Sequence, residues 1–499
     1  MKSLNIIALA VLGSLSASAA ADLSEVKVSA DLTEQRVSNP LTTKRVAYGY
    51  AQKNSVSGQE ASELDDPYYS QQNYLFSSDA YVNGSNLQPA AEYLDTKFEG
   101  GGETVRVLVI DGSFYANDEL PYVEGYSFAD TAEGSSRPEF IASEPAGSCS
   151  DEHGTGVASV YGAIRNNGSL IAGAAPNIEV VAAEALICDE GRLTDVIDSM
   201  LWGMGETVDD ATITNPVDII NLSLGYTSDT CTPAIQNVLD MAKDRGIQVY
   251  ASAGNDGEAA SQNSPSNCEN IIVAGSLNSG TDTIAGYSNY GDSVDIYTQG
   301  EDILGLDGNE GVVVAWGGTS FATPLVGATG VLLKSYFPDV TPAQAEWFIK
   351  NGSRPMSVDP ICDSMACDKG QLDALATAQR AYAYFEENTT SIKPVLNAGE
   401  ECFSTNIALK FATSARLCEL YEVSFEDSVS RENVTFELHA TPVQGGESTT
   451  ILRTDEVSIV TDEIDLDAFN YHYSICFDGE CEESPLTFQI DNSTPQECL

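Results

Sequence analysis

The chain has 499 residues, enough for two or three domains. It carries 75 acidic and 23 basic residues, a formal net charge of −52, which disfavours nucleic acid and anionic membranes as partners. High solubility, adaptation to saline water that screens the self-repulsion, or acidic residues that bind calcium would each explain this charge. The scarcity of lysine and arginine favours the saline explanation.

The N-terminus has the pattern of an exported protein. Residues 1–21 predict a signal peptide, with Lys2 before a short apolar core and small residues at the cleavage site. That core is too short to span a membrane, and no later segment is long enough. We therefore expect a secreted, extracellular protein with no membrane partner. Residues 22–61 are polar and indicate a short pro-segment or leader.

Strands and helices alternate along the next part of the chain. Apolar, β-branched runs predict strands at 105–110, 178–186, 217–223, 247–252 and 270–275. Periodic runs predict helices at 153–164, 193–204, 232–245, 320–335, 342–351 and 371–386. This alternation favours an α/β fold with a mostly parallel sheet and helices on both faces.

An acid and a histidine follow the first strand. The buried-strand pattern of residues 105–110 delivers Asp111 to the carboxyl end of a parallel strand, where such sheets place their sites. An aspartate there is also a common turn residue. His153 lies in Asp-Glu-His-Gly-Thr-Gly, and a lone histidine is commonly structural. The only other histidines, His439 and His472, lie near the C-terminus, so His153 is the base available to this part of the chain.

Ser320 stands in the motif Gly-Gly-Thr-Ser-Phe-Ala-Thr-Pro, at the start of an apolar helical run. Its hydroxyl would lie at a helix N-terminus, where the helix dipole favours developing negative charge. A serine at that place is also an ordinary helix cap. It becomes a nucleophile only with a base and an orienting acid, which His153 and Asp111 can supply.

Asn255 follows the predicted strand 247–252 after small residues. An amide at the end of a strand can stabilise a developing oxyanion. The alternative is an asparagine in a turn with glycine.

These motifs together resemble the subtilisin-like serine proteases, the subtilases, over residues 62–385. The order Asp, His, Ser is the one that this family uses. The resemblance implies that Asp111 orients and stabilises the imidazolium, that His153 is the general base and then the acid, and that Ser320 is the acylated nucleophile. The side chain of Asn255 and the N–H of Ser320 would form the oxyanion hole. No cofactor is needed for this chemistry.

The resemblance also implies where substrate binds. Two segments resemble the walls of the specificity pocket: Ser223, Leu224 and Gly225 on one side, and Ser252, Ala253 and Gly254 on the other. Gly191, in Glu-Gly-Arg, lies in a segment that would pair with an extended substrate as an added strand. The small, open walls favour broad specificity, with large apolar side chains preferred.

The chain departs from the family pattern at three places. Gly156 replaces a second histidine, Asp111 is followed by Gly-Ser instead of Thr-Gly or Ser-Gly, and Phe321 replaces the methionine after the nucleophile. None of these changes removes a group that performs the chemistry, so we expect them to affect local packing and substrate range.

A metal is also considered. Residues 163–169 resemble the loop that binds structural calcium in many subtilases, with Asn167 and Glu119 as candidate ligands. A Gly-Asn turn is the alternative. The resemblance thus allows a structural calcium, with the full set of ligands unknown.

Eleven cysteines, none in the signal peptide, predict disulfides in an exported chain. Local spacing suggests the pairs Cys149–Cys188, Cys231–Cys268, Cys362–Cys367, Cys402–Cys418 and Cys476–Cys481. The first resembles a pairing in exported bacterial subtilases. Cys498 is left over, either unpaired or joined to another molecule. Zinc is the alternative, but no pair-of-pairs spacing with histidine supports it.

The pattern changes after residue 385. Residues 386–397 form a linker with Pro394, and residues 398–499 show short alternating runs separated by turn residues. These runs predict a small C-terminal all-β domain of the β-sandwich kind. It could bind substrate, aid secretion or be trimmed off.

The leading hypothesis is a monomeric, secreted serine endopeptidase that hydrolyses peptide bonds of proteins through an acyl-enzyme. The alternatives are a narrow-specificity processing protease and a binding protein on an inactive protease scaffold. The presence of all four site residues argues against the inactive scaffold. His153 must be neutral to act as a base, so we expect activity to fall in acid and to be best above neutrality.

Overall fold

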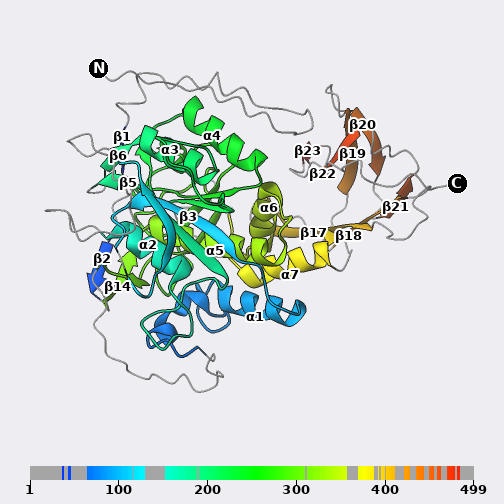
Figure 1. Ribbon diagram of the computed structural model, residues 1–499. Coiled ribbons are helices and arrows are strands. Elements are labelled where there is room, and N and C mark those ends of the chain that lie inside the picture. Colours follow the sequence, from blue (N-terminus) through cyan, green and yellow to red (C-terminus); the bar gives the residue numbers. More distant parts are fainter. Residues whose placement is uncertain are drawn as a thin grey trace. The chain divides into compact units, whose positions relative to one another are not determined.

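We describe a computed structural model of the protein. It covers residues 36–38, 43–46, 64–115, 117–129, 152–187, 190–308, 312–356 and 369–386, and the backbone of strands between 391 and 483. The chain divides into two compact units, Met1–Ala378 and Gln379–Leu499. Each unit is described by itself (Figure 1).

The first unit is built on one large, mostly parallel sheet, as the sequence predicts. The strands lie in the order β1 (Arg36–Ser38), β6 (Glu190–Arg192), β5 (Ile178–Ile187), β3 (Val105–Gly112), β7 (Ile219–Leu222), β9 (Gln248–Ser252), β11 (Ile272–Leu277) and β12 (Ile296–Gln299). β4 (Tyr122–Ser127) also pairs with β5. The strands from β5 to β12 run parallel, whereas β6 and β1 are antiparallel to their neighbours.

Helices cover both faces of this sheet. The helices of this unit are α1 (Leu87–Lys97), α2 (His153–Gly162), α3 (Leu193–Gly203), α4 (Pro233–Asp244), α5 (Thr319–Tyr336) and α6 (Pro342–Gly352), and α7 (Ala374–Phe385) crosses the boundary between the two units. α3 packs with α4 on one face, and α2 packs with α5 on the other (Figure 1). Because both faces are covered, the central strands are nearly continuous apolar runs, and only Arg106 of β3 is not buried.

The central helix α5 carries the predicted nucleophile at its N-terminal end. Every residue of this helix except Lys334 is buried, and it packs across β3, β7, β9 and β11. Two glycines permit this close packing. A Cβ atom at Gly327 would collide with the Tyr161 hydroxyl of α2, and one at Gly330 with the Tyr250 hydroxyl of β9.

Two small sheets complete the first unit. β13 (Ile303–Leu306), β14 (Val313–Gly317) and β2 (Thr43–Val46) form a three-stranded antiparallel sheet. β8 (Tyr226–Thr227) and β10 (Asn263–Ser264) form an antiparallel pair. The last strand, β14, leads directly into the turn before α5.

All five predicted strands and all six predicted helices are found, with ends that differ by up to three residues. Helix α1 was not predicted, because two of its four buried positions are alanines, Ala90 and Ala91, which give a weak apolar pattern. The short strands β1 and β6 have a single buried residue each, Val37 and Gly191, so they show no recognisable period.

Beyond the C-terminal part of α7, the described elements of the second unit are strands. They are β15 (Ser391–Ile392), β16 (Val395–Ala398), β17 (Glu401–Lys410), β18 (Tyr421–Asp427), β19 (Val434–Pro442), β20 (Thr449–Thr454), β21 (Ser458–Thr461), β22 (Phe469–Phe477) and β23 (Glu480–Glu483). One sheet contains β15 to β18 with β21, and the other contains β19, β20, β22 and β23. The β-sandwich remains a prediction. The backbone register sets Cys476 opposite Cys481.

Several predictions fall outside the described residues. The signal peptide and most of the pro-segment lie there, as do the cysteines of the pairs Cys149–Cys188 and Cys362–Cys367 and the residues Cys418 and Cys498. Among the described helices, none has the length and apolar character needed to cross a bilayer.

Candidate active site

Asp111 and His153 are joined as the sequence suggests. Asp111 lies at the end of β3 with its side chain fully buried, and His153 is the first residue of α2 and 1% exposed. The His153 Nδ1 atom lies 2.9 and 3.0 Å from the two carboxylate oxygens of Asp111. The N–H of Gly112 also donates to Asp111 Oδ1, at 2.7 Å. These bonds fix the imidazole ring and direct its Nε2 edge away from the carboxylate.

Aromatic rings pack against the imidazole. The ring of His153 meets Phe321 edge-on, with centroids 5.4 Å apart, and Trp316 at 6.3 Å. Trp316 and Phe321 stack on each other at 4.8 Å. Since Phe321 directly follows Ser320, these contacts bring the histidine and the serine turn together.

Two departures from the family pattern are explained by this packing. A Cβ atom at Gly156 would lie 2.7 Å from a ring carbon of Trp316, so no side chain fits where the family has its second histidine. The same Trp316 ring stacks on Phe321, which replaces the usual methionine. The glycine, the tryptophan and the phenylalanine therefore form one packing unit.

Ser320 occupies a sharp turn into α5. Gly318 precedes the helix with φ of 148°, a conformation that favours glycine. The Ser320 hydroxyl lies 3.4 Å from the carbonyl oxygen of Ser223, and the Ser223 hydroxyl donates to the carbonyl oxygen of Ser320 at 2.8 Å. The predicted nucleophile is thus tied to the first residue of a predicted pocket wall.

A buried chain of hydrogen bonds supports this turn, and the sequence analysis did not predict it. The hydroxyl of Tyr161 donates to Asn221 Oδ1 at 3.1 Å, and Asn221 Nδ2 donates to the Ser223 hydroxyl at 3.0 Å. Burial raises the pKa of Tyr161 well above its ordinary value, with Tyr250 adding to the effect, so the phenol stays a neutral donor.

Asn255 is oriented by the residue before Ser320. Its Oδ1 atom accepts hydrogen bonds from the N–H and the hydroxyl of Thr319, at 2.9 and 2.7 Å. These bonds turn the donor end of the amide, Nδ2, away from Thr319. The Thr319 hydroxyl also accepts from the N–H of Gly254, at 3.2 Å. Thr319 is therefore a positioning residue that the sequence analysis did not single out.

The predicted substrate edge is occupied by the chain itself. The N–H and C=O of Ser38 bond to the C=O and N–H of Gly225, both at 2.9 Å. On its other side, β1 pairs antiparallel with β6, where Val37 is opposite Gly191. The side chain of Val37 is 1% exposed and belongs to the same apolar cluster as Leu224. An extended peptide thus lies between the two predicted binding segments.

The same N-terminal segment flanks the serine turn on a second side. Strand β2 pairs antiparallel with β14, and Thr43 lies opposite Gly317, three residues before Ser320. Residues 36–38 and 43–46, which were expected only as part of a polar pro-segment or leader, are therefore both strands beside the predicted site.

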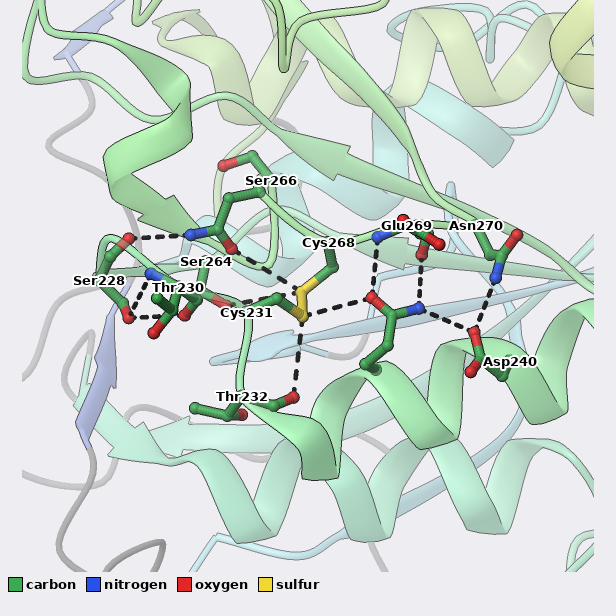
Figure 2. The surroundings of a disulfide bond; sticks show 12 residues. Ser228, Thr230, Cys231, Thr232, Asp240, Ser264, Ser266, Cys268, Glu269 and Asn270 are labelled. Atoms are coloured by element: carbon green, nitrogen blue, oxygen red, sulfur yellow. Dashed lines mark hydrogen bonds between the residues drawn. A yellow bond between two sulfur atoms is a disulfide. The ribbon is translucent and has the colours of Figure 1, made fainter.

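The second predicted wall is held by side chains from behind. The carbonyl oxygen of Ala253 accepts from Asn289 Nδ2 at 3.0 Å and from Asn263 Nδ2 at 3.3 Å. The predicted disulfide Cys231–Cys268 is present, with an S–S distance of 2.00 Å. Figure 2 shows how it ties Cys231, two residues before α4, to the turn that follows β10.

The two candidate calcium ligands are brought together but bond to each other, through Asn167 Nδ2 and Glu119 Oε1 at 3.1 Å. Both carboxylate oxygens of Asp66 accept backbone N–H groups of residues 166 and 167, at 2.8 and 3.1 Å. Glu119 Oε2 is buried and has no hydrogen-bond partner among the described residues. Over the described ranges, no three His, Cys, Asp or Glu side chains cluster as a metal site.

Comparisons with known proteins identify a family and several related proteases. The model of the subtilase family matches residues 102–379. An extracellular protease of Xanthomonas campestris is 32% identical over 60% of this chain and 54% of its own length. A thermophilic serine proteinase of Bacillus sp. strain AK1 is 31% identical over 54% of this chain and 63% of its own length. The chain thus matches little more than half of these relatives.

A solved structure agrees with these matches. A protease from Pseudoalteromonas arctica PAMC 21717 is 28% identical, with a TM-score of 0.56 over 64% of this chain and the whole of that chain.

Proposed function

Because the chain belongs to the subtilase family, we propose that it is a secreted serine endopeptidase that hydrolyses peptide bonds of proteins. Asp111, His153 and Ser320 act as its triad. The name of the relative from Xanthomonas campestris, an extracellular protease, supports the export that the signal-peptide pattern predicts. Residues 22–61 are then the pro-segment that is removed, and the mature enzyme acts as a monomer on protein or peptide substrates.

One observation carries the peptidase proposal. Strand β1 lies in an extended conformation between β6 and Gly225, bonded on both sides through backbone groups. Any peptide has these backbone groups, so an edge that binds β1 can bind protein substrates in general. Specificity is then left to the pockets that receive side chains. This supports activity on many proteins.

The geometry supports acyl transfer from Ser320. The Ser320 hydroxyl attacks the substrate carbonyl, and His153 Nε2 takes the hydroxyl proton while the Asp111 carboxylate stabilises the resulting imidazolium. The imidazolium then gives the proton to the leaving amine, which breaks the peptide bond. A water molecule, deprotonated by the same imidazole, hydrolyses the acyl-enzyme and restores the Ser320 hydroxyl.

The tetrahedral intermediate needs donors for its negative oxygen. The Nδ2 group of Asn255 and the N–H of Ser320 serve this purpose, because Thr319 occupies the opposite end of the Asn255 amide. The dipole of α5, whose N-terminus holds Ser320, adds favourable potential at the same place. A structural calcium near Glu119 would take no part in these steps.

Casein hydrolysis by the purified, matured protein tests the proposal, with Ser320→Ala as the matched variant. We expect the wild type to cut casein and unrelated denatured proteins, and Ser320→Ala to cut none of them. A wild type that cuts none of them after removal of the pro-segment would contradict the proposal.

Repeating the assay from low to high NaCl tests whether the net charge of −52 reflects a saline habitat, because that explanation predicts a rise in activity with salt.

A further inference from the structure

The side chain of Asn263, on β10, lies between the two predicted pocket walls. A Cβ atom built on Gly225 of one wall would lie 2.9 Å from Asn263 Nδ2, and one built on Gly254 of the other wall 3.0 Å from the same atom. The open sides of both glycines therefore face one amide. Asn263 as a whole is 7% exposed.

A second asparagine at the same wall shows what a purely structural role looks like. Asn289 also faces Gly254, and its Nδ2 donates to the Ala253 carbonyl at 3.0 Å. Its Oδ1 atom accepts the N–H groups of Asp256 and Glu258, at 3.0 and 3.1 Å. Both ends of the Asn289 amide are therefore engaged with the backbone of the wall.

Asn263 differs because only its donor end is engaged. Its Nδ2 donates to the Ala253 carbonyl at 3.3 Å and to the Ser266 hydroxyl at 3.0 Å. Within the described ranges, no N–H or O–H group donates to Asn263 Oδ1. An amide oxygen can accept two hydrogen bonds. The oxygen is thus available to a donor that arrives with the substrate.

We propose that Asn263 determines which substrate side chain enters this pocket, by selecting one that ends in a hydrogen-bond donor. The inference rests on the proposed peptidase function and concerns the substrate residue whose carbonyl is attacked. A glutamine-type side chain can donate to Asn263 Oδ1, whereas a methionine of similar length leaves that oxygen unpaired. The amide also takes up space between the walls, so large apolar side chains fit less well than the open walls suggested.

Four peptides that differ only at this position test the proposal: glutamine, methionine and glutamate, which have similar lengths, and phenylalanine, which is a large apolar residue. For the matured wild type we expect kcat/KM for glutamine to exceed that for methionine by about tenfold, the value of one hydrogen bond. Glutamate should be the poorest, since its carboxylate brings an acceptor against an acceptor. In Asn263→Ala the glutamine-to-methionine ratio should fall to about one, and a phenylalanine peptide should gain.

Two further variants separate selection from wall support. Ser266→Ala removes a partner of Asn263 Nδ2 but leaves the amide between the walls, so the ratio should persist. Asn289→Ala removes a wall support and should lower kcat/KM for all peptides alike. Because a ratio does not depend on the folded fraction, partial unfolding of a variant does not disturb the result.

The outcomes distinguish the two proposals. If the wild type cuts methionine or phenylalanine peptides as well as glutamine, the role of Asn263 is overturned while the peptidase function stands. An unchanged glutamine-to-methionine ratio in Asn263→Ala would likewise overturn the role of Asn263. If the wild type cuts neither these peptides nor casein, the proposed function falls, and this inference falls with it.

Discussion

The proposed reacting groups and the proposed peptide-binding edge of this protein are built in different ways. Asp111, His153 and Ser320 lie at the ends of long elements, are at most 1% exposed, and depend on the identity of a side chain. The edge consists of short strands, β6 and the Gly225 segment, and offers backbone groups. Substitutions should therefore abolish chemistry in the first region without changing binding, and should alter binding in the second without abolishing chemistry.

The largest effect is expected at Asp111. In Asp111→Asn the Nδ1 of His153 loses its negative partner, and the wrong tautomer places a proton on Nε2, so kcat should fall by about 10⁴. Thermal unfolding should show a folded protein. Asp118→Asn, an exposed acid on the following loop, is the control and should keep wild-type kcat. A small loss in Asp111→Asn would mean that the reacting groups are not those proposed.

A second effect is expected at the proposed oxyanion hole. Asn255→Ala should lower kcat by about 100- to 1000-fold with little change in KM. Thr319→Val removes one of the two bonds that orient the amide, so about tenfold is expected. Thr319→Ser keeps the hydroxyl and should restore the rate. Equal losses in kcat and affinity for Asn255→Ala would instead place this residue in general substrate binding.

The peptide-binding edge is tested with a synthetic peptide of residues 33–46. Added to the mature enzyme, it should inhibit casein hydrolysis, because β1 and β2 would return to their places. The Val37→Asp peptide should be weaker by at least about tenfold, since a buried valine contributes roughly 1.5–3 kcal/mol. The Arg36→Ala peptide changes an exposed side chain and should match the parent. If Val37→Asp inhibits as well as the parent, β1 does not mark the substrate edge.

The smallest effect concerns a carboxylate far from chemistry. Burial raises the pKa of Asp198 on α3 to about 7, with Asp209 and Asp195 adding to the shift. The folded state keeps the Asp198 carboxyl protonated up to about pH 7, whereas the unfolded state loses this proton from about pH 4. Between these pH values the contribution of Asp198 to the free energy of unfolding therefore declines. Asp198→Asn should raise Tm by about 2 °C at pH 8 and not at pH 4. An equal change at both pH values would mean that its ionisation does not matter, and casein hydrolysis should be unchanged.

The sequence pointed to Asp111 and Ser320 as candidate reacting groups because each borders a long apolar run. Asp111 ends a strand of β-branched residues, and Ser320 opens a helix preceded by two glycines. Their neighbours gave no such signal. Tyr161 and Thr319 act through contacts between segments 60 or more residues apart along the chain, and Asn263 bonds to a carbonyl 10 residues away.

The proposed peptide-binding edge could be predicted only in part from the sequence. The resemblance pointed to Gly191 and Gly225, but the partner that lies between them, Val37, is the one apolar residue of a three-residue strand. A single residue has no period, so only the three-dimensional pairing reveals it. The coupling of Gly156 with Trp316 and Phe321 was invisible for a similar reason, since 160 or more residues separate the glycine from both rings.

The disulfide Cys231–Cys268 makes the shape of one pocket wall depend on where the chain folds. It tethers the turn after β10, and β10 carries Asn263 and pairs with β8 directly beyond Gly225. Cystines persist in oxidising compartments and are reduced in the cytosol. A molecule that folds in a reducing compartment lacks this tether, so the two walls acquire their fixed spacing only in an oxidising one. The redox state of the compartment therefore controls when the protein becomes able to recognise substrate.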